Sequence, residues 1–129
     1  MASIFVRFEM PKDLVNKTYE IIEMARDSGK VRKGANEVTK LIERNQAKFV
    51  VMAEDTTPEE LLAHIPLLCE EKSIPYAYVP SKQELGSASG LTVPTTTVAV
   101  IEYGKSKILI ESLVKKLGGG KKSGKSEGN

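Results

Sequence analysis

Three apolar runs most strongly constrain the fold of this 129-residue chain. The run KFVVMAED, residues 48–55, is a continuous apolar stretch bounded by charge, which is the pattern of a buried strand. IPYAYVP, residues 74–80, and the β-branched run TTTVAVIEY, residues 95–103, are predicted to form two more strands. A fourth segment, Lys30–Lys33, is expected to be a short strand or a connector.

The stretches between these runs show the helical spacing of apolar residues. We predict helices over residues 11–28 and 35–45, from Thr57 onward, over residues 82–90 with Ser81 as the cap, and over residues 108–116. The helix from Thr57 is expected to bury Leu61, Ile65 and Leu68. Pro66 should kink that helix or begin a new segment. Because strands and helices alternate, the chain is predicted to be an α/β layered domain with helices on both faces of a mixed sheet.

Length and composition favour one globular domain, since the chain has a mass of 14.1 kDa, with 40% hydrophobic and 28% charged residues. No run approaches the length of a membrane span, and the first residues lack the apolar core of a signal peptide. The single cysteine, Cys69, excludes an intrachain disulfide framework and fits a reducing compartment, so we expect a cytoplasmic protein. The domain is predicted to cover residues 1–117.

The last residues, 118–129, contain a misleading pattern. Gly119, Gly124, Lys125 and Ser126 satisfy the phosphate-loop pattern GxxxxGK[ST]. That loop works only where a strand precedes it and a helix follows, and here three residues follow Ser126. We therefore predict a disordered Gly/Lys/Ser tail, whose lysines add only non-specific attraction for phosphate.

Charge is sorted along the chain although the net charge is only +2. Residues 30–48 contain six basic side chains and two carboxylates, a net charge of +4, whereas residues 54–71 contain six carboxylates and no lysine or arginine. A basic region of this kind attracts phosphates locally. Clustering of charges on exposed helix faces explains the same pattern, so charge alone leaves both interpretations open.

Catalysis finds little support in the sequence. His64, the single histidine, and Cys69 are five residues apart, so on one helix their side chains project about 140° apart and cannot form a nucleophile–base pair. Cys69 lies beside Leu67 and Leu68, where a buried, unreactive thiol is expected. A zinc site needs more Cys or His residues than the chain contains. We expect no enzyme activity, cofactor or metal.

The segment KVRKGANEVTK, residues 30–40, allows three interpretations: an ordinary capped helix, a phosphate-binding turn, or a surface that contacts bases. Gly34 permits a tight turn before the helix. In the helix, Asn36 and Lys40 share a face with Glu37 beside them, and together they offer a carboxylate acceptor, an ammonium donor and an amide that is both. Such a set of donors and acceptors is what is needed to hydrogen-bond to the edges of purine bases. A plain capped helix does not explain the basic cluster before Gly34.

A second element is expected opposite this helix. LGSASGLTVP, residues 85–94, is glycine-rich and then presents Leu91, Val93 and Pro94 in what is predicted to be a loop. Apolar side chains on a loop can pack against an extruded base, which is a common way to recognise irregular RNA. Aromatic stacking is excluded as the main device, because the chain has no tryptophan and only 5% aromatic residues.

These segments together carry a family resemblance. KGANEVTK, VVMAED, PLLCEEKSIPYAYVPSKQELG and ASGLTV, in this order, resemble the archaeal kink-turn-binding family of the large ribosomal subunit over residues 13–117. The resemblance implies a three-layer α/β/α sandwich around a four-stranded mixed sheet. It also implies binding to kink-turn and kink-loop RNA, in which tandem sheared G·A pairs adjoin a three-nucleotide bulge.

The resemblance assigns roles to ten residues. Asn36, Glu37 and Lys40 match positions that contact the G·A pairs, and Lys33 and Gly34 match positions that approach the RNA backbone. Leu91, Thr92 and Val93 match a loop that packs over bulged nucleotides, with Leu61 and Lys82 near the extruded base. Eukaryotic relatives tend to have an arginine at the position of Val93 and a glutamate at that of Thr57, so the loop here is of the archaeal, apolar type.

The partners that the resemblance implies are ribosomal RNA, box C/D and box H/ACA guide RNAs, ribonuclease P RNA and the other core proteins of those particles. We expect a monomer without RNA and no membrane association. The function predicted is therefore a non-catalytic RNA-binding protein that stabilises a sharp bend and nucleates ribonucleoprotein assembly. A ribosomal structural protein without kink-turn specificity, a protein-only scaffold and a hydrolytic translation factor are the alternatives.

Overall fold

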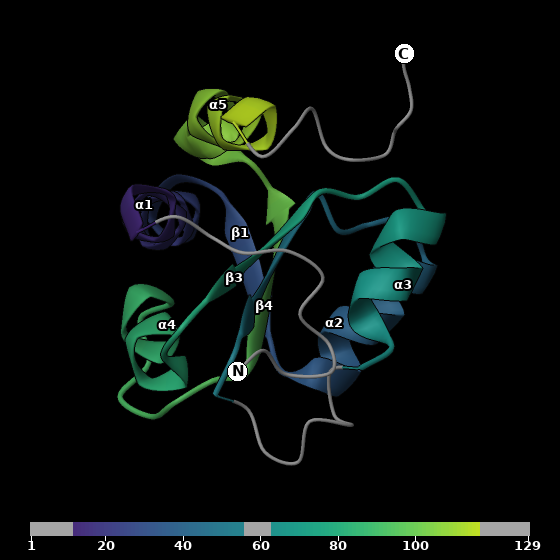
Figure 1. The fold of residues 1–129 in the computed structure, drawn as a ribbon, viewed down its shortest axis with the longest axis horizontal. Coiled ribbons are helices and arrows are strands. Elements are labelled where there is room, and N and C mark those ends of the chain that lie inside the picture. The colour runs from purple at the N-terminus through teal and green to yellow at the C-terminus, as the bar shows by residue number, and fades with distance from the viewer. Residues whose placement is uncertain (1–11, 56–62, 117–129) are drawn as a thin grey trace.

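A four-stranded mixed sheet lies between two layers of helices (Figure 1) in the computed structural model, which describes residues 12–55 and 63–116. The strands are β1 (Lys30–Lys33), β2 (Phe49–Ala53), β3 (Tyr76–Val79) and β4 (Thr97–Glu102). Their order is β1-β4-β2-β3; β4 is antiparallel to both of its neighbours, and β2 and β3 are parallel. The predicted α/β fold and mixed sheet are confirmed, and Lys30–Lys33 is a strand.

Among the described residues, three helices cover one face of the sheet and two cover the other. The helices are α1 (Lys12–Ser28), α2 (Ala35–Glu43), α3 (Ile65–Glu71), α4 (Lys82–Ala88), the 3-10 turn η2 (Gly104–Ser106) and α5 (Lys107–Lys116). Figure 1 shows α1, α4 and α5 on one side of the sheet and α2 and α3 on the other. The three-layer arrangement is therefore present. Within the described ranges no helix is long and apolar enough to cross a membrane.

The central strand β2 is apolar throughout, rather than alternating, because both of its faces are buried. Phe49, Val51 and Ala53 pack in the cluster under α1, α4 and α5, whereas Val50 and Met52 pack in the cluster under α2 and α3. All five side chains are buried, because successive residues of a strand point to opposite faces and both faces are covered. Burial of each large apolar side chain contributes about 1.5–3 kcal/mol.

Two helices end earlier than predicted: α4 ends at Ala88 instead of residue 90, and α2 ends at Glu43 instead of near Asn45. α2 ends at Glu43 because Arg44 caps it and Asn45 takes a φ of 59°, a left-handed conformation that a continuing helix cannot adopt. α3 begins at Ile65, so Pro66 lies in its first turn, which confirms the second of the two alternatives predicted for Pro66, the beginning of a new segment.

The buried side of α3 is also shifted from the prediction. Ile65 is buried as predicted, but Leu68 is only half-buried, since the helix turns Pro66 and Cys69 toward the core beside Ile65. The predicted helix start at Thr57 and the predicted burial of Leu61 lie outside the described residues. The tail predicted for residues 118–129 lies outside them as well.

Candidate nucleic-acid interface

One end of the sheet collects the segments that carry the predicted site. β1, β2 and β3 all end there and β4 begins there, because β4 is antiparallel to β1 and β2 while β3 is parallel to β2. The segments at this end are Lys33–Gly34, Glu54–Asp55, Pro80–Lys82 and residues 91–96. Two helices, α2 and α4, begin at this end on opposite faces of the sheet (Figure 1).

Gly34 fixes the start of α2. Its φ of 98° lies in the region that favours glycine, and its backbone N–H donates to the carbonyl of Thr97 over 3.0 Å. A Cβ at this position would meet no atom within 4 Å, so there is space for a side chain. Glycine is favoured here by the backbone conformation alone. As the N-cap it provides no side-chain hydrogen bond, which leaves the first-turn N–H groups of α2 without that partner.

The three predicted base-contacting side chains lie on the solvent side of α2. Val38, Leu41 and Ile42 face the core, whereas Asn36, Glu37 and Lys40 are exposed. Within residues 12–55 and 63–116, Glu37 and Lys40 do not form the ion pair that a plain capped helix would favour. Their donors and acceptors are therefore presented to solvent together, within the first turns of one helix.

The loop of residues 91–94 lies along α4 and is held at both ends. The backbone N–H of Leu91 donates to Gly86 over 2.9 Å, and that of Thr95 donates to the carbonyl of Lys82 over 3.1 Å. Val93 is 58% exposed, a large fraction for an apolar side chain, and Thr92 and Pro94 are exposed as well. The expected loop is therefore present and presents apolar surface to solvent.

Gly86 is a site residue that sequence reasoning missed, since the sequence indicated only that its segment is glycine-rich. A Cβ at Gly86 would stand 2.2 Å from the carbonyl oxygen of Val93, which is closer than any real contact. The loop backbone therefore rests directly on α4. A glycine inside an otherwise helical segment, followed by an apolar loop, was the available signal.

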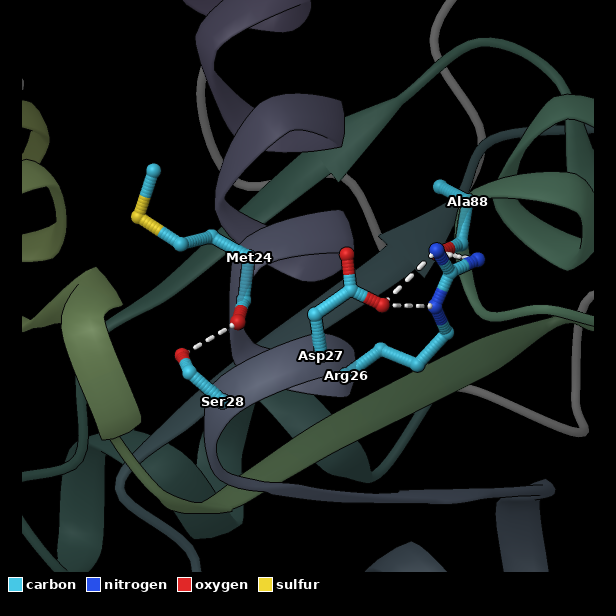
Figure 2. A network of polar contacts seen from close by, with 5 residues as sticks. All are labelled: Met24, Arg26, Asp27, Ser28 and Ala88. Carbon is cyan, nitrogen blue, oxygen red and sulfur yellow. Dashed lines mark hydrogen bonds and ion pairs between the residues drawn. The ribbon is translucent and has the colours of Figure 1, made fainter.

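Arg26 of α1 is a second residue that sequence reasoning missed. Figure 2 shows its guanidinium group between Asp27 and the carbonyl of Ala88, with an ion pair of 2.9 Å to Asp27 and a hydrogen bond of 3.4 Å to Ala88. The next turn contains Gly90, where a Cβ would lie 2.8 Å from Cδ of Arg26. Arg26 thus packs against the point where α4 ends and the loop begins.

Lys82 begins α4 at the same end of the sheet. Its backbone N–H donates to Oδ1 of Asp55 over 2.9 Å, and Oγ of Ser81 accepts from the N–H of Glu84, which confirms the predicted cap. Lys33 is exposed beside Gly34 and pairs with Val98. All the predicted site residues except Leu61, which lies outside the described residues, are therefore on segments at this end. Their contacts with RNA stay a prediction.

The two side chains considered for catalysis, Cys69 and His64, are respectively buried and in contact with a neighbouring helix. Cys69 is fully buried, and burial, with a smaller contribution from Glu70, raises the pKa of its thiol to about 12. His64 lies at the start of α3, where Nε2 is 2.8 Å from Oγ1 of Thr39 on α2. The part of the chain that the structure describes contains no group of three His, Cys, Asp or Glu side chains able to hold a metal ion.

Two comparisons with known proteins agree with this architecture. The chain is similar to a solved structure, the 15.5kD RNA-binding protein of Giardia lamblia, with 28% sequence identity and a TM-score of 0.83 over 90% of this chain and 96% of that one. Residues 16–110 match the ribosomal protein L7Ae/L30e/S12e/Gadd45 family. Since that match covers well over half of the sequence, the chain belongs to this family.

Proposed function

We propose that this chain is a non-catalytic RNA-binding protein that recognises and stabilises kink-turn and kink-loop RNA. One observation supports the proposal most directly: an exposed polar helix start and an exposed apolar loop lie at one end of the sheet, on opposite faces of it. Family membership and the RNA-binding neighbour of known structure add support.

The polar part of this surface suits G·A pairs. The Glu37 carboxylate would accept from purine amino groups, the Lys40 ammonium would donate to guanine O6 or N7, and the Asn36 amide would do either. The uncapped first turn of α2 and the exposed Lys33 would attract the neighbouring phosphates. Base contacts and phosphate contacts would thus come from adjacent residues, as specific recognition requires.

The apolar part suits the nucleotides that a sharp bend extrudes. Leu91, Thr92 and Val93 would pack over the unstacked bases, with Lys82 beside them and Leu61 contributing to the same contact. Because Val93 is apolar, it would pack against a base and would not form an ion pair with phosphate.

The biological setting belongs to the same proposal. The RNAs would be ribosomal RNA, box C/D and H/ACA guide RNAs and ribonuclease P RNA, and binding would nucleate particles that include other core proteins. The protein would act in the cytoplasm and would be a monomer without RNA.

A gel-shift series tests the proposal with a kink-turn RNA and with the same RNA in which both G·A pairs are converted to Watson–Crick pairs. The wild-type protein should prefer the kink-turn RNA. Glu37→Ala should reduce that preference by about 1–3 kcal/mol, roughly 5- to 150-fold, because a base contact is lost. Glu43→Ala, on the same helix and also exposed, is the matched control and should leave the preference unchanged.

Lys33→Ala separates phosphate contacts from base contacts. It should weaken binding to both RNAs alike and lower the slope of log affinity against log salt by about 1. A wild-type protein that binds both RNAs equally would contradict the proposal. Failure to retain RNA at moderate salt would favour a protein-only scaffold.

A further inference from the structure

A second basic surface begins at the opposite end of the sheet from the proposed kink-turn site and extends along β1 toward that site. It consists of four exposed cations from three elements, Lys30, Arg32, Arg44 and Lys48, and is called the basic track below. Lys30 and Arg32 belong to the edge strand β1, Arg44 caps the end of α2, and Lys48 precedes β2. None of them was assigned a role in the proposed site.

Strand register brings the track together. Lys30 pairs with Glu102 across a register shift, and the backbone N–H of Lys48 donates to Val100, so the two lysines flank the carboxyl end of β4 from opposite sides. Between them the surface is hollowed by about 340 Å³. The hollow is lined by Lys30, Asn45, Gln46, Lys48, Ile101 and Glu102.

The track runs back toward the proposed site along β1 and α2. Arg32 pairs with Ala99, whose side chain packs in the cluster under α2 and α3, so Arg32 points to the same face of the sheet as α2. Because α2 begins where β1 ends and folds back beside it, the helix leads from Lys40 in the proposed site to Arg44, which directly precedes Asn45 of the hollow. A strip of cations therefore joins the two ends of the domain on the α2 side.

Protection of a sheet edge does not account for this arrangement. Edge strands often have lysines and arginines that block pairing with other chains, which would explain Lys30 and Arg32. It does not explain Arg44 and Lys48, which lie outside the edge strand. In the described part of the chain none of the four cations forms an ion pair, although Glu43 and Glu102 are nearby in sequence or register.

The outer side of α1, in the other helical layer, has an acidic patch. A hollow of about 360 Å³ beside α1 is lined by Glu20, Glu23 and Asp27, with Lys105 at its side. A polyanion would therefore be attracted to the α2 side of the sheet and repelled from the outer side of α1. This asymmetry favours one direction for an RNA that leaves the proposed site.

We infer that the basic track binds the phosphate backbone of one helical arm that continues from the bend, as an extension of the RNA-binding function proposed above. The four cations and the side-chain amides of Asn45 and Gln46 supply donors for phosphate oxygens and no base-specific pattern. The track would thus add affinity and fix the direction of the arm, while the choice of G·A pairs would stay with the helix start at Gly34.

Binding to three kink-turn RNAs tests the inference: one with minimal arms, and two with about ten base pairs added to one arm or to the other. The variant Lys30→Gln/Arg44→Gln/Lys48→Gln removes three cations of the track. The control variant Lys105→Gln/Lys115→Gln/Lys116→Gln removes the same charge from exposed positions of η2 and α5, in the other helical layer. Circular dichroism and thermal unfolding establish that each variant is folded.

The wild-type protein should bind one of the two long-armed RNAs more tightly than the minimal RNA. The track variant should lose that gain in affinity, so at low salt it should bind the long-armed RNA about tenfold more weakly than the wild-type protein does. The slope of log affinity against log salt for that RNA should fall by about 2–3. The control variant should keep the gain, and both variants should keep the preference for G·A pairs. If the triple variant does not fold, Lys48→Glu, which changes neither β1 nor α2, should show the same loss of gain.

Two outcomes overturn the inference alone: a wild-type protein that is indifferent to arm length, or a control variant that loses as much as the track variant. Indifference of the wild-type protein to the G·A pairs would overturn the proposed function, and this inference with it. The Watson–Crick RNA included in the same series distinguishes the two failures.

Discussion

Replacement of Gly86 by alanine tests whether α4 holds the apolar loop in place. In an ordinary helix interior, Gly→Ala stabilises a protein by about 1 kcal/mol, because glycine has more backbone freedom to lose. Here the added methyl group would lie 2.2 Å from the carbonyl oxygen of Val93 and 3.1 Å from Cα of Pro94. Both are backbone atoms, so relief requires the loop itself to withdraw by most of an ångström.

The structure indicates what that withdrawal would break. The hydrogen bonds from Leu91 to Gly86 and from Thr95 to Lys82 hold the loop, and each contributes a net of about 0.5–1.5 kcal/mol. Their joint loss, about 1–3 kcal/mol, offsets or exceeds the gain in helix propensity. We therefore expect Gly86→Ala to lower the free energy of unfolding by up to about 2 kcal/mol rather than raise it.

RNA affinity should respond more clearly than stability. In the proposed complex, a displaced loop would no longer pack Val93 on a bulged base, and loss of that burial, about 1.5 kcal/mol, would correspond to about tenfold weaker binding. Urea unfolding and kink-turn gel shifts measure the two effects. Ser87→Ala is the matched control, since Ser87 is exposed on the same helix and should gain slightly in stability and bind normally. If Gly86→Ala behaves like Ser87→Ala in both assays, α4 does not hold the loop.

Other substitutions probe the remaining features. Gly34→Ala should cost about 1–2 kcal/mol through its φ of 98° alone, because no atom lies within 4 Å of the added Cβ; a loss above 3 kcal/mol in urea unfolding would indicate a clash instead. Cys69 should resist a thiol reagent at pH 8 until the protein unfolds, because its pKa is raised to about 12; rapid labelling of the folded protein would contradict its burial. Burial also raises the pKa of Tyr19 to about 12. Unfolded chains would release the protons of Cys69 and Tyr19 first, so the stability that these groups contribute is complete below about pH 9. Above that pH it should fall by at most about 1.4 kcal/mol per pH unit for Cys69, and by less for Tyr19, which is only partly buried and is screened by solvent. Tyr19→Phe should flatten that decline, and an unchanged pH profile would count against the assignment.

The strands were predicted well from the sequence, because a short run of apolar residues is enough to indicate a buried strand. The run at residues 48–55 is apolar on both faces, which is typical of a strand covered on both sides. The start of α2 was predictable for the same reason, since Gly34 precedes a helical stripe with three exposed polar side chains. The end of α2 was predicted less accurately, and the sequence left two alternatives open at Pro66, because single-residue events at Asn45 and Pro66 decide these boundaries.

What the sequence did not predict depends on contacts between distant segments. The glycine at position 86 indicates a close approach but not which segment approaches, and Arg26 lies 62 residues from the carbonyl of Ala88 that it contacts. The terminal helix has the same difficulty: its spacing is regular, but Ile108 is 78% exposed while Ile110 and Leu113 are buried. Only the packing partner decides which side of such a helix faces inward.

Strand β4 explains how two segments far apart in the chain can form one surface. Its first residue, Thr97, accepts a hydrogen bond from the N–H of Gly34, and its Oγ1 donates to Val51 over 2.8 Å in the neighbouring strand. Two residues earlier, Thr95 is bonded to Lys82 at the start of α4. The helix start and the loop are thus both attached to the beginning of one buried strand, whose position the core determines. A surface held in this way loses little conformational entropy on binding, so its contacts would contribute to RNA affinity more fully than those of a mobile loop.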